Sequence, residues 1–563
     1  MHSLTIPQQN IWNLHKFYEG TSIANNCGAI FFDKLCDHSL LNRAINRLVE
    51  LQEGMRLRFW EEHGTPVQKA AAYEWEDFPS FRFTSEHDFD LHAEGLARIP
   101  FSADGGKMYR FEIFDTGNCS GVLMCVSHLI ADAWAISIIA HTVASEYEAL
   151  SGGSAADGRS CSFLPFVDAE QDYLTSERYR KDQAYWAEKY PVRPEPTPIR
   201  PGSLPSKTPT ARRYRAAFSP ELSASIDQFY RKHNITQAVL IESALTAYLS
   251  RLSPEHRQIT LGALTLNRSG AVQKRAVANC ITTMPLAIPV APGMTAMDLC
   301  REITRQHVQL FRHQKYPYSH ILHDLHERYG FSGNLYDVMV SFQNAKSNSE
   351  VSSKWYSNGF CEVGLELHID NRDSSDHYTV NIDYQTELFP DETEIRLLFL
   401  RLVHILEQIL NTPDRKLSAL SLLPRTEQDQ LLFGFNQTHI PYPSDKCIQE
   451  LFVQQVLAHP DKTALVFHGQ HFTFRQLDGM SNSLAHELIA RGIGPGSIVP
   501  IVSRRSWHII VAMLGILKAG GAYMHVDITY PTERIQYMVQ TANADFALVS
   551  NPLSENKSKI QSC

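Results

Sequence analysis

The chain has 563 residues and a formal net charge of −9, with 43% hydrophobic and 20% charged residues. This length is enough for about three or four hydrophobic cores of ordinary size. The acidic balance leaves no basic stripe for nucleic acid. The strongest apolar run, residues 509–517, is shorter than the ~20 residues that a bilayer span requires. We therefore expect a chain of several domains, with neither a nucleic-acid nor a membrane partner.

The N-terminus and the cysteines indicate the compartment. Residues 1–4 contain neither the basic nor the apolar region of a secretory signal. The ten cysteines are scattered without a Cys-x-x-Cys pair, which argues against a disulfide framework and a zinc site. The spacing of His320, His323 and His326 spreads them around a helix, so we expect no metal there. These features favour a cytoplasmic protein without a bound metal.

Residues 121–147 form the most informative segment. Residues 121–126 are continuously apolar, which is typical of a strand covered on both faces. His128 follows at the end of this strand, and Asp132 precedes a helical apolar pattern, where it can act as the N-cap. A strand, a short loop and a helix would place the His128 imidazole where a pocket can open. On spacing alone, a packed or surface histidine remains the alternative.

Further along the chain, helical and strand patterns lie on both sides of a proline-rich stretch. Residues 173–190 and 222–250 have helical periodicity, whereas residues 258–266 and 378–384 alternate as strands do. Prolines recur through residues 191–209 together with glycine, serine and threonine, which forbids a continuous helix. We expect this extended segment to join two α/β lobes.

Seven short motifs occur in the order that they have in condensation domains of nonribosomal peptide synthetases. They lie at residues 4–12, 52–59, 127–133, 172–186, 278–286, 313–318 and 336–344. The chain resembles this family across roughly the first 424 residues. It departs from the family's His-His-x-x-x-Asp-Gly motif at two positions, because Ser127 replaces the first histidine and Ala133 replaces the glycine.

The rest of the chain resembles the start of an adenylation domain. Residues 472–477 and 517–523 are similar to the first two motifs of that family. Because Gly520 and Gly521 lie between two apolar segments, they are a poor phosphate cradle and predict a tight turn. The chain stops at Cys563, before the nucleotide loop, the acidic motifs and the lysine of the family. We therefore expect no adenylation activity from it.

The resemblance implies an α/β fold. Two lobes similar to chloramphenicol acetyltransferase would form a V, followed by a partial α/β adenylation subdomain. The expected division is residues 1–175 for the N-terminal lobe, 176–423 for the C-terminal lobe, 424–446 for a linker and 447–563 for the incomplete adenylation domain. Donor and acceptor substrates would enter from opposite faces and meet at the histidine motif, where the lobes join.

The resemblance also assigns roles to individual residues. His128 would orient the attacking amine and accept its proton. Asp132 would be structural, with Arg268 as its ion-pair partner, although an exposed turn residue is the alternative for Arg268. The motif neighbours are Ser127, Ala133 and Trp134. Positioning should contribute most to the rate, since near-attack geometry can supply about 7–11 kcal/mol, whereas a general base adds about 10²–10⁴-fold.

The predicted function is amide-bond formation in nonribosomal peptide synthesis. Only three residues precede the first motif, so we expect a donor in trans, a fatty or other acyl group on coenzyme A or an acyl carrier protein. The acceptor would be an aminoacyl carrier protein. Both substrates would be phosphopantetheine thioesters, with no bound cofactor. The Pro7-Gln8 opening and the Asp132-Ala133-Trp134 sequence resemble starter domains. An ordinary elongation domain and a catalytically silent interaction module are the alternatives.

Overall fold

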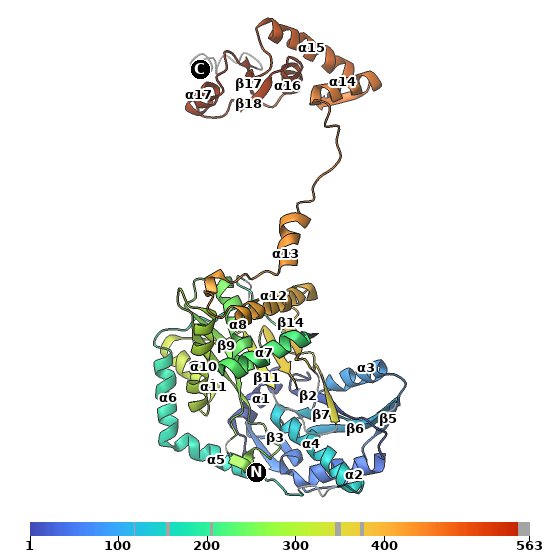
Figure 1. Cartoon of the computed structure of the whole chain (residues 1–563), viewed down its shortest axis with the longest axis vertical. Coiled ribbons are helices and arrows are strands. Elements are labelled where there is room, and N and C mark those ends of the chain that lie inside the picture. The colour runs from blue at the N-terminus through green and yellow to red at the C-terminus, as the bar shows by residue number, and fades with distance from the viewer. Residues whose placement is uncertain are drawn as a thin grey trace. The chain divides into compact units, whose positions relative to one another are not determined.

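The computed structural model describes residues 1–117, 119–153, 158–202, 206–268, 270–343, 351–371 and 376–549. Asn344, at the end of the last condensation motif, lies outside these residues. The chain divides into two compact units, Met1–Gly434 and Phe435–Cys563 (Figure 1). Each unit is built from helices and β-sheets, which confirms the predicted α/β class.

The first core of the larger unit surrounds a five-stranded sheet with the order β12-β2-β7-β6-β5. Its strands are β2 (Asn25–Phe32), β5 (Ser80–Phe83), β6 (Tyr109–Thr116), β7 (Cys119–Ser127) and β12 (Val351–Tyr356). The sheet packs with α2 (His38–Leu51), α3 (Glu86–Ala97) and α4 (Ala133–Leu150). The predicted strand at residues 121–126 lies within β7, which is buried along nearly all its length because both faces are covered.

Two further elements complete this side of the unit. A small sheet has the order β1-β4-β3, with β1 (His2–Ser3), β3 (Leu57–Glu62) and β4 (Thr65–Ala70). Thr5 is the N-cap of helix α1 (Ile6–Phe17), and its capping box with Gln8 fixes the first turn. The side chain of Gln8 is buried, and its Nε2 donates a hydrogen bond to Leu129 O at 3.1 Å. The opening motif therefore contacts the loop that follows His128.

The second core lies beside the first in the same unit (Figure 1) and surrounds a six-stranded sheet with the order β10-β9-β11-β13-β14-β8. Its strands are β8 (Ala211–Ala217), β9 (Gln258–Thr265), β10 (Thr282–Pro289), β11 (Val338–Gln343), β13 (Leu365–Asp370) and β14 (Thr379–Gln385). The helices around it are α7 (Pro220–His233), α8 (Gln237–Leu252), α10 (Ala296–Arg312), α11 (Tyr318–Tyr329) and α12 (Glu392–Asn411). The predicted strands at residues 258–266 and 378–384 correspond to β9 and β14.

Both predicted helical stretches contain a break. Residues 222–250 fold as α7 and α8, because Asn234 adopts a left-handed conformation with φ of 55° and Thr236 caps the next helix. Residues 173–190 span the end of α5 (Leu164–Thr175) and α6 (Glu177–Lys189). The hydroxyl of Ser176 accepts a hydrogen bond from Tyr179 N–H and so starts the second helix. Each break is a local capping interaction that interrupts an otherwise continuous apolar pattern.

The expectation that residues 191–209 join the two lobes is wrong. Trp186 and Tyr190 precede this stretch, Ile199 lies within it, and all three pack in the second core. The chain therefore passes between the cores earlier, across α5 and α6, since Phe166 and Val167 of α5 belong to the first core. The aromatic side chains of α6 fix the chain to the second core before the prolines begin.

The two cores also share segments of chain. Strand β12 follows β11 in sequence but pairs with β2 of the first sheet. Helix α9 (Gly270–Gln273) leads into residues 276–280, most of which pack in the first core. Gly54 permits this crossing, because a Cβ atom there would lie only 2.0 Å from Val277 O. The expected boundary between lobes at 175/176 falls between α5 and α6, and the residues after it contribute to both cores.

The smaller unit follows α13 (Arg425–Asp429) and a short π-helical turn, Gln430–Gly434. It contains a hairpin of β15 (Thr463–Phe467) and β16 (Gln470–Thr473), and a parallel sheet of β17 (Ile498–Ser503), β18 (Ala522–Asp527) and β19 (Leu548–Val549). Its helices are α14 (Ile448–Ala458), α15 (Phe474–Ala490), α16 (His508–Lys518) and α17 (Thr532–Thr541). Gly520, with φ of 86°, turns the chain from α16 into β18, as predicted.

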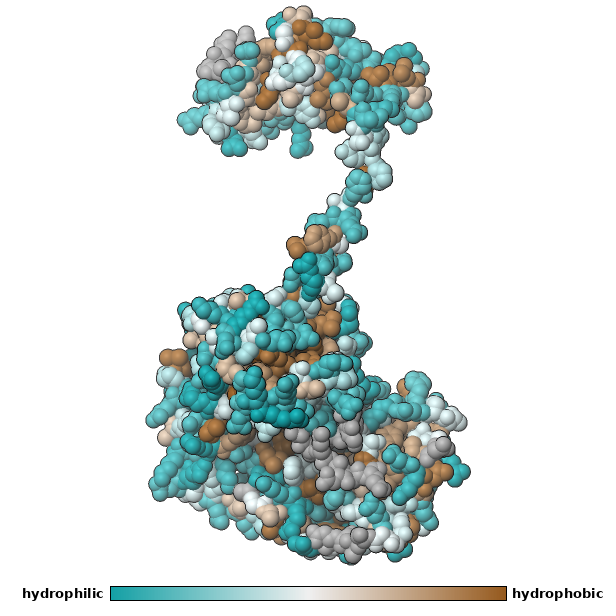
Figure 2. Space-filling model, viewed as in Figure 1, coloured by the Kyte–Doolittle hydropathy of each residue, from teal (hydrophilic) through white to brown (hydrophobic). Residues whose placement is uncertain are grey.

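The surface is mainly hydrophilic in the view of Figure 2, with scattered hydrophobic patches on both units. Leu432, Phe433 and Phe435 are exposed large hydrophobic residues near the junction of the units. Among the described helices, none combines the length and the apolar character needed to cross a bilayer.

Candidate active site

His128 is the first residue after β7, and the end of this strand is held from both sides. The N–H of His128 donates to Ala24 O at 2.7 Å, and the N–H of Ser127 donates to Met108 O at 2.9 Å. Within the described part of the chain, neither ring nitrogen of His128 has a hydrogen-bond partner. Burial lowers the pKa of His128, and the nearby carboxylates of Asp132 and Glu366 only partly oppose this shift. The imidazole is thus neutral at physiological pH and free to accept a proton.

A cavity of about 500 Å³ opens beside the His128 ring, and both cores line it. The first core contributes mainly apolar side chains from α1, β2 and α4, including Ile11, Cys27, Ala133 and Ile136. The second core contributes a largely polar wall from its sheet, including Ser341, Glu366, His368 and Asn381. The histidine motif therefore lies where the two lobes meet, in a space that is large enough for the reacting part of a substrate.

Asp132, which lines this cavity, is brought together with Arg268. Nη2 of Arg268 lies 3.0 Å from each carboxylate oxygen of Asp132. The exposed fractions of the two side chains are 0% for Arg268 and 2% for Asp132. Arg268 is therefore a buried partner of the carboxylate and not an exposed turn residue.

The Asp132 carboxylate also caps α4 and binds the crossing segment. Oδ1 accepts a hydrogen bond from Ala135 N–H at 2.7 Å, which is the N-cap interaction that the sequence predicts. Oδ2 accepts from Cys280 N–H at 2.8 Å and from Ile281 N–H at 3.1 Å. Arg268 in turn donates to Ala276 O and Ala278 O, both at 2.7 Å. One buried ion pair thus ties the start of α4 to the backbone that arrives from the second core.

The second motif supports the same segment through a separate set of contacts. The side chain of Gln52 accepts a hydrogen bond from Val277 N–H at 3.0 Å and donates to Arg275 O at 3.2 Å. Gly54 provides the close approach to Val277 described above. Residues 52–54 therefore hold residues 275–277, which continue directly into the contacts with Asp132.

The three motif neighbours have different surroundings. Ser127 is buried, and its Oγ accepts a hydrogen bond from Leu129 N–H at 3.2 Å. It is not among the described residues that line the cavity, whereas Ala133 is. Trp134 donates from Nε1 to Lys274 O at 2.9 Å. Of the two departures from the family motif, only the one at residue 133 changes the cavity wall.

The fourth and sixth motifs meet around a residue that the sequence analysis did not single out, Asp182. Its fully buried carboxylate accepts a hydrogen bond from Tyr173 OH at 2.9 Å and lies 2.8 Å from Nδ1 of His313. Tyr185 stacks on the His313 ring with 3.9 Å between ring centroids. These motif residues thus form a structural cluster, which attaches α6 to the end of α10.

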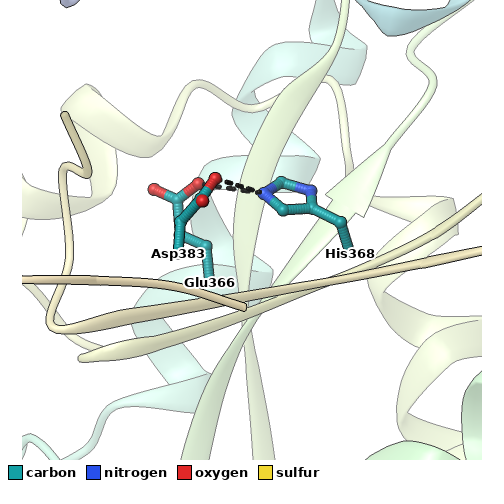
Figure 3. A group of neighbouring side chains, drawn as sticks. All are labelled: Glu366, His368 and Asp383. Atoms are coloured by element: carbon teal, nitrogen blue, oxygen red, sulfur yellow. Dashed lines mark ion pairs between the residues drawn. The ribbon is translucent and has the colours of Figure 1, made fainter. Parts of the chain in front are cut away.

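A group of charged residues on the cavity wall was not predicted from the sequence (Figure 3). Nε2 of His368 lies 3.5 Å from Glu366 Oε2 and 3.5 Å from Asp383 Oδ2. Arg213 holds both oxygens of Asp383, with Nε at 2.8 Å from Oδ1 and Nη2 at 2.6 Å from Oδ2. The alternation of apolar and polar residues along the strand at 365–370 could have indicated this group. It puts Glu366 and His368 on the face opposite the core residues Leu365 and Leu367.

The contacts within this group are those of a charge network. The ligand atoms of Glu366, His368 and Asp383 lie within 4.8 Å of one another, as a metal site would require. The guanidinium of Arg213, however, pairs with both oxygens of Asp383, so a metal cation there would face a positive charge already in place. Burial lowers the pKa of His368, but the carboxylates of Asp383 and Glu366 outweigh this effect and raise it to about 9. His368 is therefore protonated where His128 is neutral.

Comparison with known proteins identifies the family. Residues 1–432 match the family model described as condensation domain, and residues 452–563 match the one described as AMP-binding enzyme. The chain belongs to the condensation-domain family. This result confirms the resemblance found in the seven motifs, and the second match agrees with the resemblance of the C-terminal part to adenylation domains.

Among curated proteins, this condensation-domain protein is 29% identical to surfactin synthase subunit 1 of Bacillus subtilis (strain 168), over 98% of this chain and 16% of that protein. It is 27% identical to gramicidin S synthase 2 of Aneurinibacillus migulanus, over 97% of this chain and 12% of that protein. The chain thus spans less than a fifth of the length of either relative.

Among solved structures, the starter condensation domain of rhizomide synthetase, in complex with C8-CoA, aligns with a TM-score of 0.66 and 18% identity over 75% of this chain and 97% of that one. The first condensation domain of the calcium-dependent antibiotic synthetase aligns with a TM-score of 0.67 and 17% identity over 75% of this chain and 99% of that one. These likenesses confirm the predicted fold, which is that of condensation domains.

A four-domain nonribosomal peptide synthetase bound to AMP and glycine matches more of the chain. It aligns with a TM-score of 0.79 and 17% identity over 98% of this chain and 43% of that one. The likeness supports the order of the two units along the chain, a condensation fold followed by the beginning of an adenylation fold.

Proposed function

We propose that this protein forms an amide bond between an acyl thioester and the amino group of an aminoacyl thioester. The observation that carries this proposal is the position of His128, whose unpartnered ring lines a cavity shared by both cores. A general base must reach the substrate and must be unprotonated at the working pH. The burial that lowers the pKa of His128 meets the second requirement.

The reaction has two steps at the thioester carbonyl. The neutral α-amine attacks the carbonyl carbon, which forms the C–N bond and leaves a negative charge on the carbonyl oxygen. His128 accepts the proton that the nitrogen loses. Collapse of the tetrahedral intermediate breaks the C–S bond, and the departing thiolate takes up the proton from His128. The products are an amide and a free thiol, so no oxidant or nucleotide is consumed.

Asp132 and Arg268 act in this scheme as positioning residues. Arg268 does not line the cavity, and the Asp132 carboxylate, at the cavity wall, is already engaged by Arg268 and by backbone N–H groups. Their hydrogen bonds hold the start of α4 and residues 276–281 against the loop that carries His128. This rigidity matters because near-attack geometry can contribute about 7–11 kcal/mol to the barrier reduction.

We further propose a chain-initiating role for the domain. The donor would be a fatty or other carboxylic acyl group on coenzyme A or an acyl carrier protein, and the acceptor an amino acid on a carrier protein. Two sequence features support this subtype, the Pro7-Gln8 opening and the Asp132-Ala133-Trp134 form of the histidine motif. The likeness to a starter domain in complex with C8-CoA also supports it.

The test is a condensation assay with the whole chain. The protein is incubated with an aminoacyl-loaded carrier protein and a panel of acyl-coenzyme A donors, and the mass of the carrier's product is measured. The proposal predicts a mass increase equal to the acyl group, which disappears without the protein. Acceptance of a peptidyl carrier protein as the sole donor would replace the initiating role with elongation. No product from any donor would favour the silent interaction module.

A further inference from the structure

The cavity wall from the second core is the polar face of a sheet. On β13, Glu366 and His368 alternate with the core residues Leu365 and Leu367. His368 pairs with Ser341 of β11 and Asn381 of β14, and these residues line the same cavity. A hydrocarbon chain against this wall would remove the polar groups from water without replacing their hydrogen bonds, which is unfavourable.

The ring of His368 has a fixed orientation within this wall. Both carboxylates lie on the Nε2 side, and the other nitrogen is on the opposite edge of the ring (Figure 3). Since Arg213 fixes Asp383, the carboxylate that orients the ring is itself held in place. Within the described part of the chain, Nδ1 has no hydrogen-bond partner. The side chain lines the cavity and is 24% exposed, so its free N–H is available to a ligand.

The network and the reacting centre share one cavity. His128, Glu366 and His368 all line it. A substrate that reacts at His128 can therefore also present a group to His368.

We propose that His368 is a specificity-determining residue that donates a hydrogen bond from Nδ1 to an acceptor oxygen on the acyl chain or on the aminoacyl side chain. This inference rests on the proposed function, because it assigns the substrate class of the same cavity. It predicts that a substrate with a carbonyl oxygen at the right position is preferred over its hydrocarbon counterpart. The expected preference is about 10- to 100-fold in kcat/KM, the size associated with a hydrogen bond to a charged group.

The first arm of the test varies the donor. The whole protein is offered octanoyl-coenzyme A in competition with each of a series of oxo-octanoyl-coenzyme A donors, in which a keto group moves from carbon 4 to carbon 7. The ratio of the two products gives the ratio of kcat/KM values. If the oxygen is carried on the acyl chain, one or two keto positions should be preferred.

The second arm varies the acceptor. Leucyl- and asparaginyl-loaded carrier proteins compete for a single donor, because the two side chains have similar shapes and only asparagine carries a carbonyl oxygen. Preference for asparagine would locate the oxygen on the aminoacyl group. Preference in one arm and not in the other identifies which substrate His368 contacts.

Three variants test whether His368 causes the preference. His368→Phe removes the donor, His368→Gln keeps a neutral donor, and His323→Gln changes an exposed histidine of α11 as a matched control. The preference should fall to about unity in His368→Phe, fall less in His368→Gln, and remain in His323→Gln. A product ratio is measured within one reaction, so partial unfolding of a variant does not alter it.

The outcomes separate this inference from the proposed function. If the wild-type protein forms amides from all donors and acceptors with ratios near unity, the role of His368 is refuted and the condensation activity stands. A preference that survives in His368→Phe would also refute that role. If the wild-type protein forms no amide at all, the proposed function itself fails.

Discussion

Arg268 and Asp132 form a buried ion pair that joins two parts of the fold, with Nη2 of Arg268 at 3.0 Å from both oxygens of Asp132. Asp132 is the N-cap of α4, and Arg268 follows β9 of the second sheet. The hydrogen bonds from Cys280 and Ile281 to the same carboxylate extend the junction. The position of His128 relative to the polar wall of the cavity therefore depends on this pair.

Replacing Asp132 with alanine should lower the melting temperature of the larger unit. The change removes a helix cap and leaves the Arg268 charge buried without its partner, which typically costs about 3–5 kcal/mol. Asp391→Ala is the matched control, because Asp391 caps α12 through Thr393 N–H but is exposed and has no arginine partner within the described part of the chain. Calorimetry should show a clearly smaller decrease for Asp391→Ala. Equal decreases would mean that only the cap matters at Asp132.

Local patterns were sufficient to predict several of these features. The apolar run before His128 predicted β7, and the position of Asp132 before a helical pattern predicted its capping role. The junction of the cores was not predictable, because it depends on contacts between residues far apart in sequence, such as Gly54 with Val277 and β12 with β2. The network around His368 was missed for the same reason, since Arg213, Asp383 and Glu366 come from three strands.

Gly54→Ala tests the crossing segment directly. The new methyl group would lie 2.0 Å from Val277 O, so the backbone that continues to Cys280 would have to shift and would disturb its hydrogen bonds with Asp132. We expect a lower melting temperature and a slower condensation reaction. Gly95→Ala is the control, because Gly95 lies in α3 and a methyl group added there would have no atom within 4 Å among the described residues. It should be neutral or stabilising by up to about 1 kcal/mol. Equal behaviour of the two variants would contradict the role of residues 276–280.

Ser127→Ala should have little effect, although Ser127 occupies the position of a histidine in the family motif. The substitution removes the acceptor of the Leu129 N–H, and a typical hydrogen bond contributes about 0.5–1.5 kcal/mol. Because Ser127 does not line the described cavity, the rate of amide formation should be unchanged. A large loss of rate with a normal melting temperature would show that Ser127 takes part in the reaction.

The pKa values of the two cavity histidines should be shifted in opposite directions. Burial lowers the pKa of His128, so its midpoint should lie below the ordinary value of about 6.5. The pKa of His368 is raised to about 9 by Asp383 and Glu366 against the effect of burial. Its stabilising contribution is therefore complete below about pH 6.5 and is lost as the pH rises through about 9.

Nuclear magnetic resonance of protein with ¹³C-labelled histidine measures both midpoints. The two signals are assigned by their loss in His128→Ala and His368→Gln. A His128 midpoint at or above about 6.5 would contradict its buried, neutral state. A His368 midpoint near the ordinary value would contradict its pairing with two carboxylates.

The most direct test of the mechanism is the rate of amide formation by His128→Ala. If His128 accepts the proton of the attacking amine, the substitution should reduce the rate by at least about 10²-fold, the lower range for a general base. The melting temperature should stay close to that of the wild type, because the imidazole makes no hydrogen bond within the described part of the chain. His323→Ala, at an exposed histidine, should react at the wild-type rate. A wild-type rate for His128→Ala would show that positioning alone accounts for catalysis, and the role of His128 as a base would be wrong.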